Sequence, residues 1–205
     1  MRTKISRAAR TIRVAFATLA LLSSCNSDYT PRQRGYFKID LPQHQYQKFD
    51  QPGYPYSFEY PLYANVIRDS TFFEAAPENP YWINIDFPRF NAKIYISYKD
   101  IGRNSFDKLR EDAFKMTFKH TYKASSIDQT PIQTPNGIGG IFFNVGGNAA
   151  TAHQFFVSDT TRHFLRGALY FDTTPNEDSL RPVNDFLQAD MDHLINTLRW
   201  RASGQ

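Results

Sequence analysis

The sequence has 205 residues, of which 41% are hydrophobic and 16% aromatic, which is enough for one buried core but short for two full domains. Its formal net charge is +4, but five of the 24 basic residues lie before residue 14, in a segment that we expect to be removed. The remaining 19 Lys and Arg residues face 20 Asp and Glu residues. A general electrostatic attraction to nucleic acid is therefore not expected.

Residues 1–24 have the layout of an export signal, with a basic start followed by an apolar run over residues 14–22. This run is too short to cross a bilayer, which takes about 20 apolar residues. It ends in Leu22, Ser23, Ser24 and Cys25, the pattern of a bacterial lipobox. We expect cleavage between Ser24 and Cys25, and acylation of Cys25 as the link to the membrane. The alternative is an ordinary secretion signal followed by a free thiol.

The mature chain divides by composition into three parts. Residues 25–35 are small, polar or turn-forming after the cysteine and predict a flexible tether of about 30 Å when extended. Residues 36–201 predict one globular domain, and residues 202–205 a short tail. Because Cys25 is the only cysteine, no internal disulfide is expected, and the core must supply the stability. Residues 37–41 alternate and predict an extended segment laid against the domain.

Residues 54–61 combine aromatic side chains with two prolines and predict an extended segment at the edge of a sheet. So many large rings cannot all face a small core, and tyrosines suit a protein interface. The candidate interface residues are Tyr54, Tyr56, Phe58, Tyr60 and Tyr63. The alternative is a strand packed on both faces.

Two alternating runs, 82–87 and 94–98, predict neighbouring antiparallel strands. The spacing then changes to that of a helix beginning after a cap at Asn104, with a core stripe of Phe106, Leu109, Ala113 and Met116.

Four further strands are predicted around 125–132, 138–145, 152–157 and 163–172, of which the last three form a meander. A final helix begins at a cap on Asp178 or Ser179, keeps Pro182 in its first turn, and carries one apolar stripe. The stripe comprises Leu180, Val183, Leu187, Met191, Leu194 and Leu198. This order predicts an α+β fold whose mainly antiparallel sheet is covered by helices. It resembles the PsbP-like domains.

The sequence contains no convincing catalytic or metal-binding motif. His120, His153 and His163 lack the tight ligand spacing of a zinc site, and His153 shares a strand face with apolar residues, which favours a hydrogen-bonded histidine at the core. No nucleophile turn and no phosphate loop accompany the serines and glycines. We therefore predict no catalytic residue, no metal and no cofactor.

Beyond the lipobox, six segments carry a family resemblance: residues 34–42, 54–61, 82–88, 146–150, 154–157 and 163–171. With them the whole mature chain resembles GldD, the gliding-motility lipoprotein of Bacteroidota. The resemblance implies a non-enzymatic envelope component, anchored by Cys25, whose partners are other gliding or type IX secretion proteins. It also implies a position in the cell envelope, at the periplasmic face of the outer membrane. The competing class is an exported hydrolase or small-ligand-binding lipoprotein.

The same resemblance raises O-glycosylation, because Bacteroidota modify exported proteins at Asp-Ser or Asp-Thr followed by an apolar residue or Thr. The pattern is met at Ser70, Thr160, Thr173 and Ser179. The alternative is a structural role in turns or at a helix cap.

Overall fold

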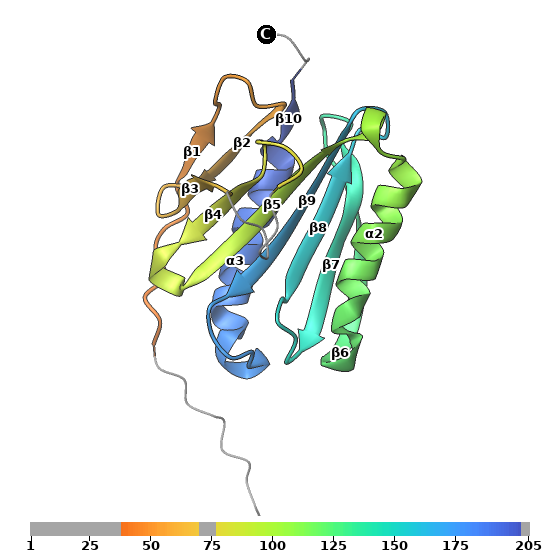
Figure 1. Ribbon diagram of the computed structural model, residues 1–205. Coiled ribbons are helices and arrows are strands. Elements are labelled where there is room, and N and C mark those ends of the chain that lie inside the picture. Colours follow the sequence, from red (N-terminus) through yellow and green to blue (C-terminus); the bar gives the residue numbers. More distant parts are fainter. Residues whose placement is uncertain (1–37, 70–76, 202–205) are drawn as a thin grey trace, which may run out of the picture. The chain divides into compact units, whose positions relative to one another are not determined.

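The computed structural model describes residues 38–69 and 77–201 (Figure 1). By its internal contacts the chain divides into residues 1–38 and 39–205, and the elements below belong to the second unit. The signal segment, Cys25 and the predicted tether lie outside the described residues. Within those residues no helix combines the length and apolar character needed to cross a membrane.

A seven-stranded antiparallel sheet forms the centre of the domain, in the order β3-β4-β5-β9-β8-β7-β6. The predicted pairing of the first two alternating runs is confirmed, with Ile83 opposite Ile96. The predicted meander is confirmed as β7-β8-β9, and β6 joins it at the edge. The strands are β3 (Asn65–Arg68), β4 (Ile83–Phe87), β5 (Ala92–Asp100), β6 (Ala124–Gln133), β7 (Gly139–Gly147), β8 (His153–Ser158) and β9 (His163–Phe171).

A second, three-stranded sheet joins the two ends of the described chain. Its strands are β1 (Tyr46–Phe49), β2 (Tyr56–Pro61) and β10 (Arg199–Trp200), and β2 lies in the middle. The predicted edge position of β2 is therefore wrong. Its prolines are compatible with a central place because Pro55 precedes the strand and Pro61 is its last residue. Of the segment predicted to lie against the domain, residues 38–41 are described, and they form no strand; Ile39 and Leu41 are exposed.

The first predicted helix is α2 (Phe106–Phe118), flanked by the 3-10 turns η2 (Ile101–Arg103) and η3 (Lys119–Tyr122). Its N-cap is Ser105 rather than Asn104, whose side chain instead donates to the Asp100 carbonyl at 3.1 Å. Its buried stripe ends at Thr117, whereas Met116 is exposed. A further 3-10 turn, η1 (Pro88–Phe90), links β4 to β5.

The second predicted helix is α3 (Glu177–Thr197). Asn176, and not Asp178 or Ser179, caps it by accepting from the Ser179 N–H at 3.0 Å. The helix therefore begins earlier than expected and places Pro182 in its second turn. Most of the predicted stripe is buried, while Leu180 is only partly covered.

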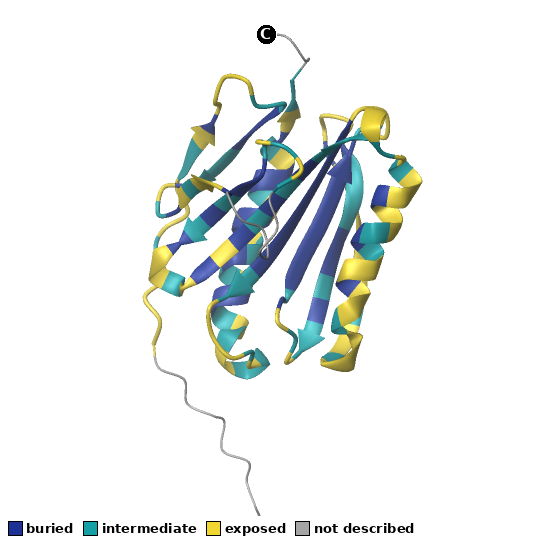
Figure 2. Cartoon of the chain, in the orientation of Figure 1, coloured by how far each residue is buried: buried dark blue, intermediate teal, exposed yellow. Residues whose placement is uncertain are grey.

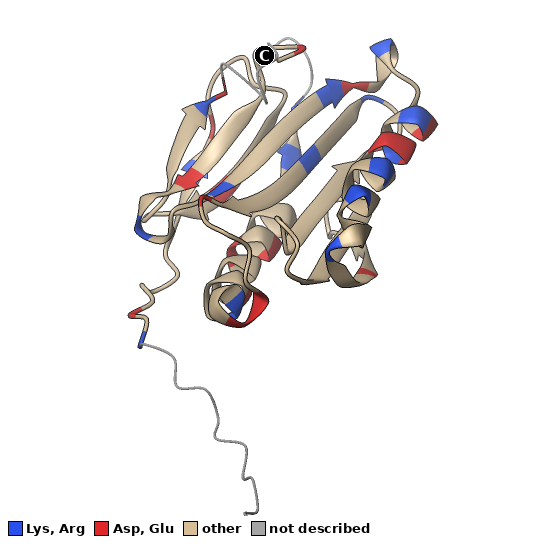
Figure 3. Cartoon of the chain, turned by 60° about the horizontal axis from the view of Figure 1, so that its bottom comes forward, with Lys and Arg blue, Asp and Glu red and all other residues tan. Residues whose placement is uncertain are grey.

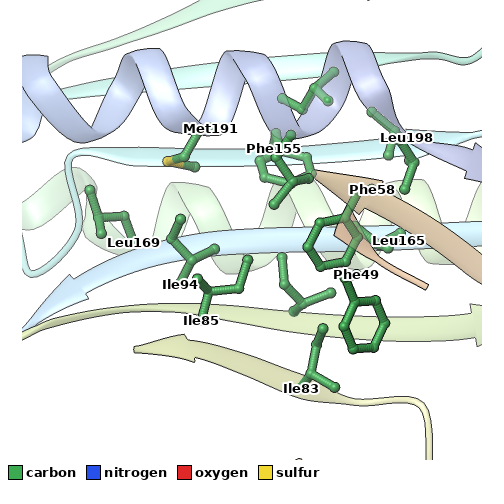
Figure 4. Close-up of a cluster of buried hydrophobic side chains, with 14 of the residues drawn as sticks. Phe49, Phe58, Ile83, Ile85, Ile94, Phe155, Leu165, Leu169, Met191 and Leu198 are labelled. Carbon is green, nitrogen blue, oxygen red and sulfur yellow. The ribbon is translucent and has the colours of Figure 1, made fainter. Parts of the chain in front are cut away.

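Each face of the large sheet packs on a different layer. One face meets α3 and the small sheet, and its side chains form the main core. Figure 4 shows Met191 of α3, and Leu198 directly after the helix, directed at strand residues such as Leu165 and Ile94. The other face packs against α2 through a smaller cluster of Leu109, Ala113, Phe143, Phe156 and Phe164. The central strands are buried and the outer side of α2 is exposed (Figure 2), with acidic and basic residues along it (Figure 3). The predicted α+β class is confirmed.

Candidate functional site

The predicted aromatic interface is wrong for its two central members. Tyr56 and Phe58 are 0% and 1% exposed, because their rings join the main core. Tyr54, Tyr60 and Tyr63 are partly buried against the same core. The alternative, a strand packed on both faces, is what the structure contains.

The buried carboxylate of Asp190 on α3 contacts three polar side chains from the N-terminal part of the domain. Asp190 accepts from the hydroxyl of Tyr63 and from that of Tyr46 at 3.1 Å, and its other contact is His44 Nδ1 at 2.7 Å. Its side chain is 1% exposed, compared with 35% for His44. We call these four residues the Asp190 cluster. The cluster fastens the first strand and the loop after β2 to the C-terminal helix.

The two tyrosines of the Asp190 cluster have raised pKa values. Burial, together with the charge of Asp190, raises the pKa of Tyr46 to about 12. Burial and the hydrogen bond to Asp190 raise the pKa of Tyr63 further above the ordinary tyrosine value. Both hydroxyls therefore remain donors near neutral pH. The ring of Tyr46 also stacks on His193, whose Nε2 lies 2.7 Å from Glu59 of β2.

His163 is held in place by a hydrogen bond and by ring stacking. Its Nδ1 lies 2.8 Å from the Tyr98 hydroxyl, and its ring stacks on Trp200 with centroids 4.9 Å apart. Burial lowers its pKa, although the charge of Asp159 opposes the shift. Residues 38–69 and 77–201 contain no group of three or more His, Cys, Asp or Glu side chains placed to hold a metal.

His153 lines a cavity of about 260 Å³ between α3 and the strands β6, β7 and β8. Its Nδ1 lies 2.9 Å from Asn144 Oδ1, but its Nε2 is buried without a hydrogen-bond partner. The expectation that both nitrogens are hydrogen-bonded is therefore wrong. Across the cavity Asn184 of α3 also has a buried Oδ1 without a partner. We call this cavity the Asn184 pocket.

The strand side of the Asn184 pocket contains an irregularity. The β6–β7 register shifts between Ala124 and Ser126, which marks a β-bulge. Opposite it, Gly147 has φ +88°, and a Cβ there would lie 2.7 Å from the Ser125 nitrogen. Only glycine fits this approach. The bulge lies beside Ser126, a residue of the pocket wall.

A second cavity, of about 550 Å³, opens on the large sheet near η1. Its walls include Tyr95 and Tyr170, which meet edge to face, and the ion pair of Lys93 with Asp86. Behind Tyr170, Arg166 is buried and donates to Gln154 Oε1. Burial lowers the pKa of Arg166, and the neighbouring Tyr170 opposes the shift.

Three of the four predicted glycosylation residues are described, and Ser70 is not. Thr160 lies in a turn with φ 63°, and its hydroxyl donates to the Asp159 carbonyl at 2.7 Å. Thr173 is exposed directly after β9, and Ser179 is exposed in the first turn of α3. Modification at these positions stays a prediction.

The family model for the gliding motility lipoprotein GldD matches residues 26–200, which is most of the chain. The chain belongs to this family. No curated protein matches the chain. A solved structure, the solution structure of cyanobacterial PsbP (CyanoP) from Synechocystis sp. PCC 6803, is 9% identical, covers 83% of this chain and 99% of its own, and superposes with a TM-score of 0.44. Membership of the GldD family makes this a gliding-motility lipoprotein of the cell envelope.

Proposed function

We propose that this GldD-family chain is a non-enzymatic assembly component that binds other envelope proteins and couples gliding to the type IX secretion machinery. In this proposal Cys25 carries the lipid, and the domain works at the periplasmic face of the outer membrane. Lipid anchoring by two or more acyl chains is strong enough for a stable attachment, at about 0.8 kcal/mol per buried CH₂.

The Asp190 cluster carries this proposal. The domain would be held by its N-terminus while moving partners pull on it, so its first folded segment has to be fastened to the core. Asp190 provides this by binding His44, just before β1, and Tyr46, the first residue of β1, to α3. Buried hydrogen bonds to a charged group contribute about 1.5–3 kcal/mol each. In this proposal the Asp190 cluster fixes the tethered end of the domain.

A small-ligand-binding lipoprotein is the second candidate, and the cavity beside Tyr95 and Tyr170 favours it. An exported hydrolase, the other alternative, would need a catalytic base, and a substitution of His163 tests for one. His163→Gln should leave gliding intact if the protein only binds and assembles.

The test replaces the gene in a gliding cell with variants at Cys25 and His163. Cys25→Ala should move the protein out of the membrane fraction, stop colony spreading and reduce the release of type IX cargo. The matched control is Ser27→Ala, close to the anchor but outside the lipobox, which should change nothing. Membrane-bound Cys25→Ala protein in normally gliding cells would contradict the anchor. Loss of gliding in His163→Gln at unchanged abundance and partner copurification would contradict the non-enzymatic role.

Glycosylation at the exposed Thr160, Thr173 or Ser179, or at Ser70, would add to this proposal a bulky, solubilising group. The intact mass of the exported protein tests it, because a mass equal to that of the lipidated polypeptide removes the modification from the proposal.

A further inference from the structure

Two hydrogen-bond acceptors on residues of the Asn184 pocket, one on His153 and one on Asn184, lack a donor. As the Asn144 amide is placed, its Oδ1 accepts, so the contact at 2.9 Å puts the proton on His153 Nδ1. His153 Nε2 is then an acceptor, and it is buried without a donor. Asn184 Oδ1 is a second acceptor without a partner, on a residue that is 9% exposed. Buried polar groups nearly always have partners, so two orphans in one cavity call for a ligand or water that donates.

The pKa of His153 agrees with a neutral imidazole that can accept a hydrogen bond. Burial lowers its pKa to about 4, although the charge of Asp185 and the backbone carbonyl of Asn184 oppose the shift. The imidazole is therefore neutral at physiological pH.

The charges around the cavity have one predominant sign. Asp128, Glu177 and Asp185 line it together with one cation, Arg181. Arg181 already faces Asp178 at 3.4 Å. Among the described residues, Asp185 has no salt bridge or hydrogen-bond partner. The side chain of Asp128 accepts only from the Ser126 hydroxyl, at 3.3 Å. Negative charge and orphan acceptors together favour a positively charged donor.

We propose that the Asn184 pocket binds the ammonium group of a lysine side chain presented by a partner protein. The ammonium has three donors and no acceptor, which matches His153 Nε2, Asn184 Oδ1 and the carboxylate of Asp185. The cavity of about 260 Å³ has room for the end of one lysine side chain and little else. Because the acids around it do not form a metal-binding group with His153, the geometry selects an organic cation over a divalent metal.

That the partner is an envelope protein rests on the proposed function, whereas the ammonium chemistry rests on the pocket alone. The test therefore measures binding by the purified lipoprotein. The lipidated protein, with ¹⁵N-labelled histidine, is placed in nanodiscs, where NMR resolves its five imidazoles. His153→Gln identifies the His153 signal by its loss. The probe is Nα-acetyl-lysine methylamide, and its neutral counterpart carries an acetylated side-chain nitrogen.

The lysine probe should shift the His153 Nε2 resonance saturably, and the acetylated probe should not. Asn184→Leu should weaken binding at least tenfold, and Asp185→Asn about threefold, whereas Asn184→Asp should tighten it about threefold. Asp107→Asn removes an exposed helix aspartate far from the pocket and should match the wild type. An amide of Asn184 that instead donated to His153 would make the aspartate variant bind more weakly, and this would overturn the proposal.

Four other results would also overturn it. An equal shift with the acetylated probe would mean an apolar pocket, and a shift with Ca²⁺ or Mg²⁺ alone would mean a metal site. Binding of butylammonium without binding of the lysine probe would mean that the ligand of the pocket is a free small amine and not a protein lysine. Absence of any saturable shift would mean that water alone fills the cavity. None of these results depends on gliding, which the Cys25 variants test separately.

Discussion

Asp190 and Asn184 lie six residues apart on the same helix, and both are buried, but their surroundings are opposite. Asp190 is surrounded by donors from His44, Tyr46 and Tyr63, so its hydrogen-bonding capacity is used within the domain. The Oδ1 of Asn184 accepts no hydrogen bond, and the same is true of His153 Nε2, whose residue lines the same cavity.

The contrast separates a polar group that serves the fold from one that is free to serve recognition. A buried group that is satisfied internally strengthens the fold, and its removal leaves former partners unpaired. An orphaned acceptor costs stability until a ligand arrives, and its replacement by an apolar side chain costs little. Substitutions at the two positions should therefore change stability with opposite signs.

The largest effect is expected at Asp190. Asp190→Ala leaves two tyrosine hydroxyls and an imidazole without their shared acceptor and should lower the free energy of unfolding by about 3 kcal/mol. Urea denaturation of the lipoprotein in detergent measures this. Asp192→Asn is the matched control: burial alone raises the pKa of Asp192, so neutralising it should cost less than about 1 kcal/mol. Equal losses in both variants would show that the Asp190 cluster contributes no special stability.

The next effect is a dependence on pH that originates at His153. Its folded pKa of about 4 lies below the ordinary value of 6.5, so between these pH values the unfolded chain binds the proton and the folded chain does not. The contribution of His153 to stability is therefore complete above pH 6.5 and decreases toward pH 4, by about 1.4 kcal/mol per pH unit at most. His153→Gln should flatten the stability profile in this window. Parallel profiles for the wild type and the variant would refute a neutral, buried His153.

The smallest stability effect is expected at Asn184, and its sign is the informative part. Asn184→Leu removes an acceptor without a partner and should raise the free energy of unfolding by about 1 kcal/mol or leave it unchanged. The measurement is the same urea titration, with Asn184→Ala to separate lost volume from lost polarity. A decrease above about 1 kcal/mol for the leucine variant would mean that Asn184 is satisfied within the domain.

Local sequence patterns predicted most of the helices and strands, because alternation indicates a strand and a spacing of three to four residues indicates a helix. Alternation over residues 82–87 and 94–98 gave β4 and β5, and the spacing from Val183 to Leu198 gave α3. The strands β1, β3 and β10 escaped prediction, because β1 and β3 have four residues each and β10 has two. None of the three is long enough to show a period.

The functional groups were harder to find because their partners are distant in the sequence. Tyr46 and His44 lie 144 and 146 residues from Asp190, and no local pattern links them. A weaker signal was present in α3 itself, where Asn184 and Asp190 interrupt the apolar face that carries Val183, Leu187 and Met191. A polar residue on a buried stripe requires either a partner or a ligand, but only the structure decides between them.

The most direct test of binding through α3 compares two variants of Asn184 in gliding cells. Asn184→Asp, which keeps acceptors and adds a charge, should preserve colony spreading. Asn184→Leu should stop spreading, although the protein is as abundant, as stable and as firmly membrane-bound as the wild type. Normal gliding of the Asn184→Leu cells at wild-type protein level would contradict a role for this pocket in the gliding machinery.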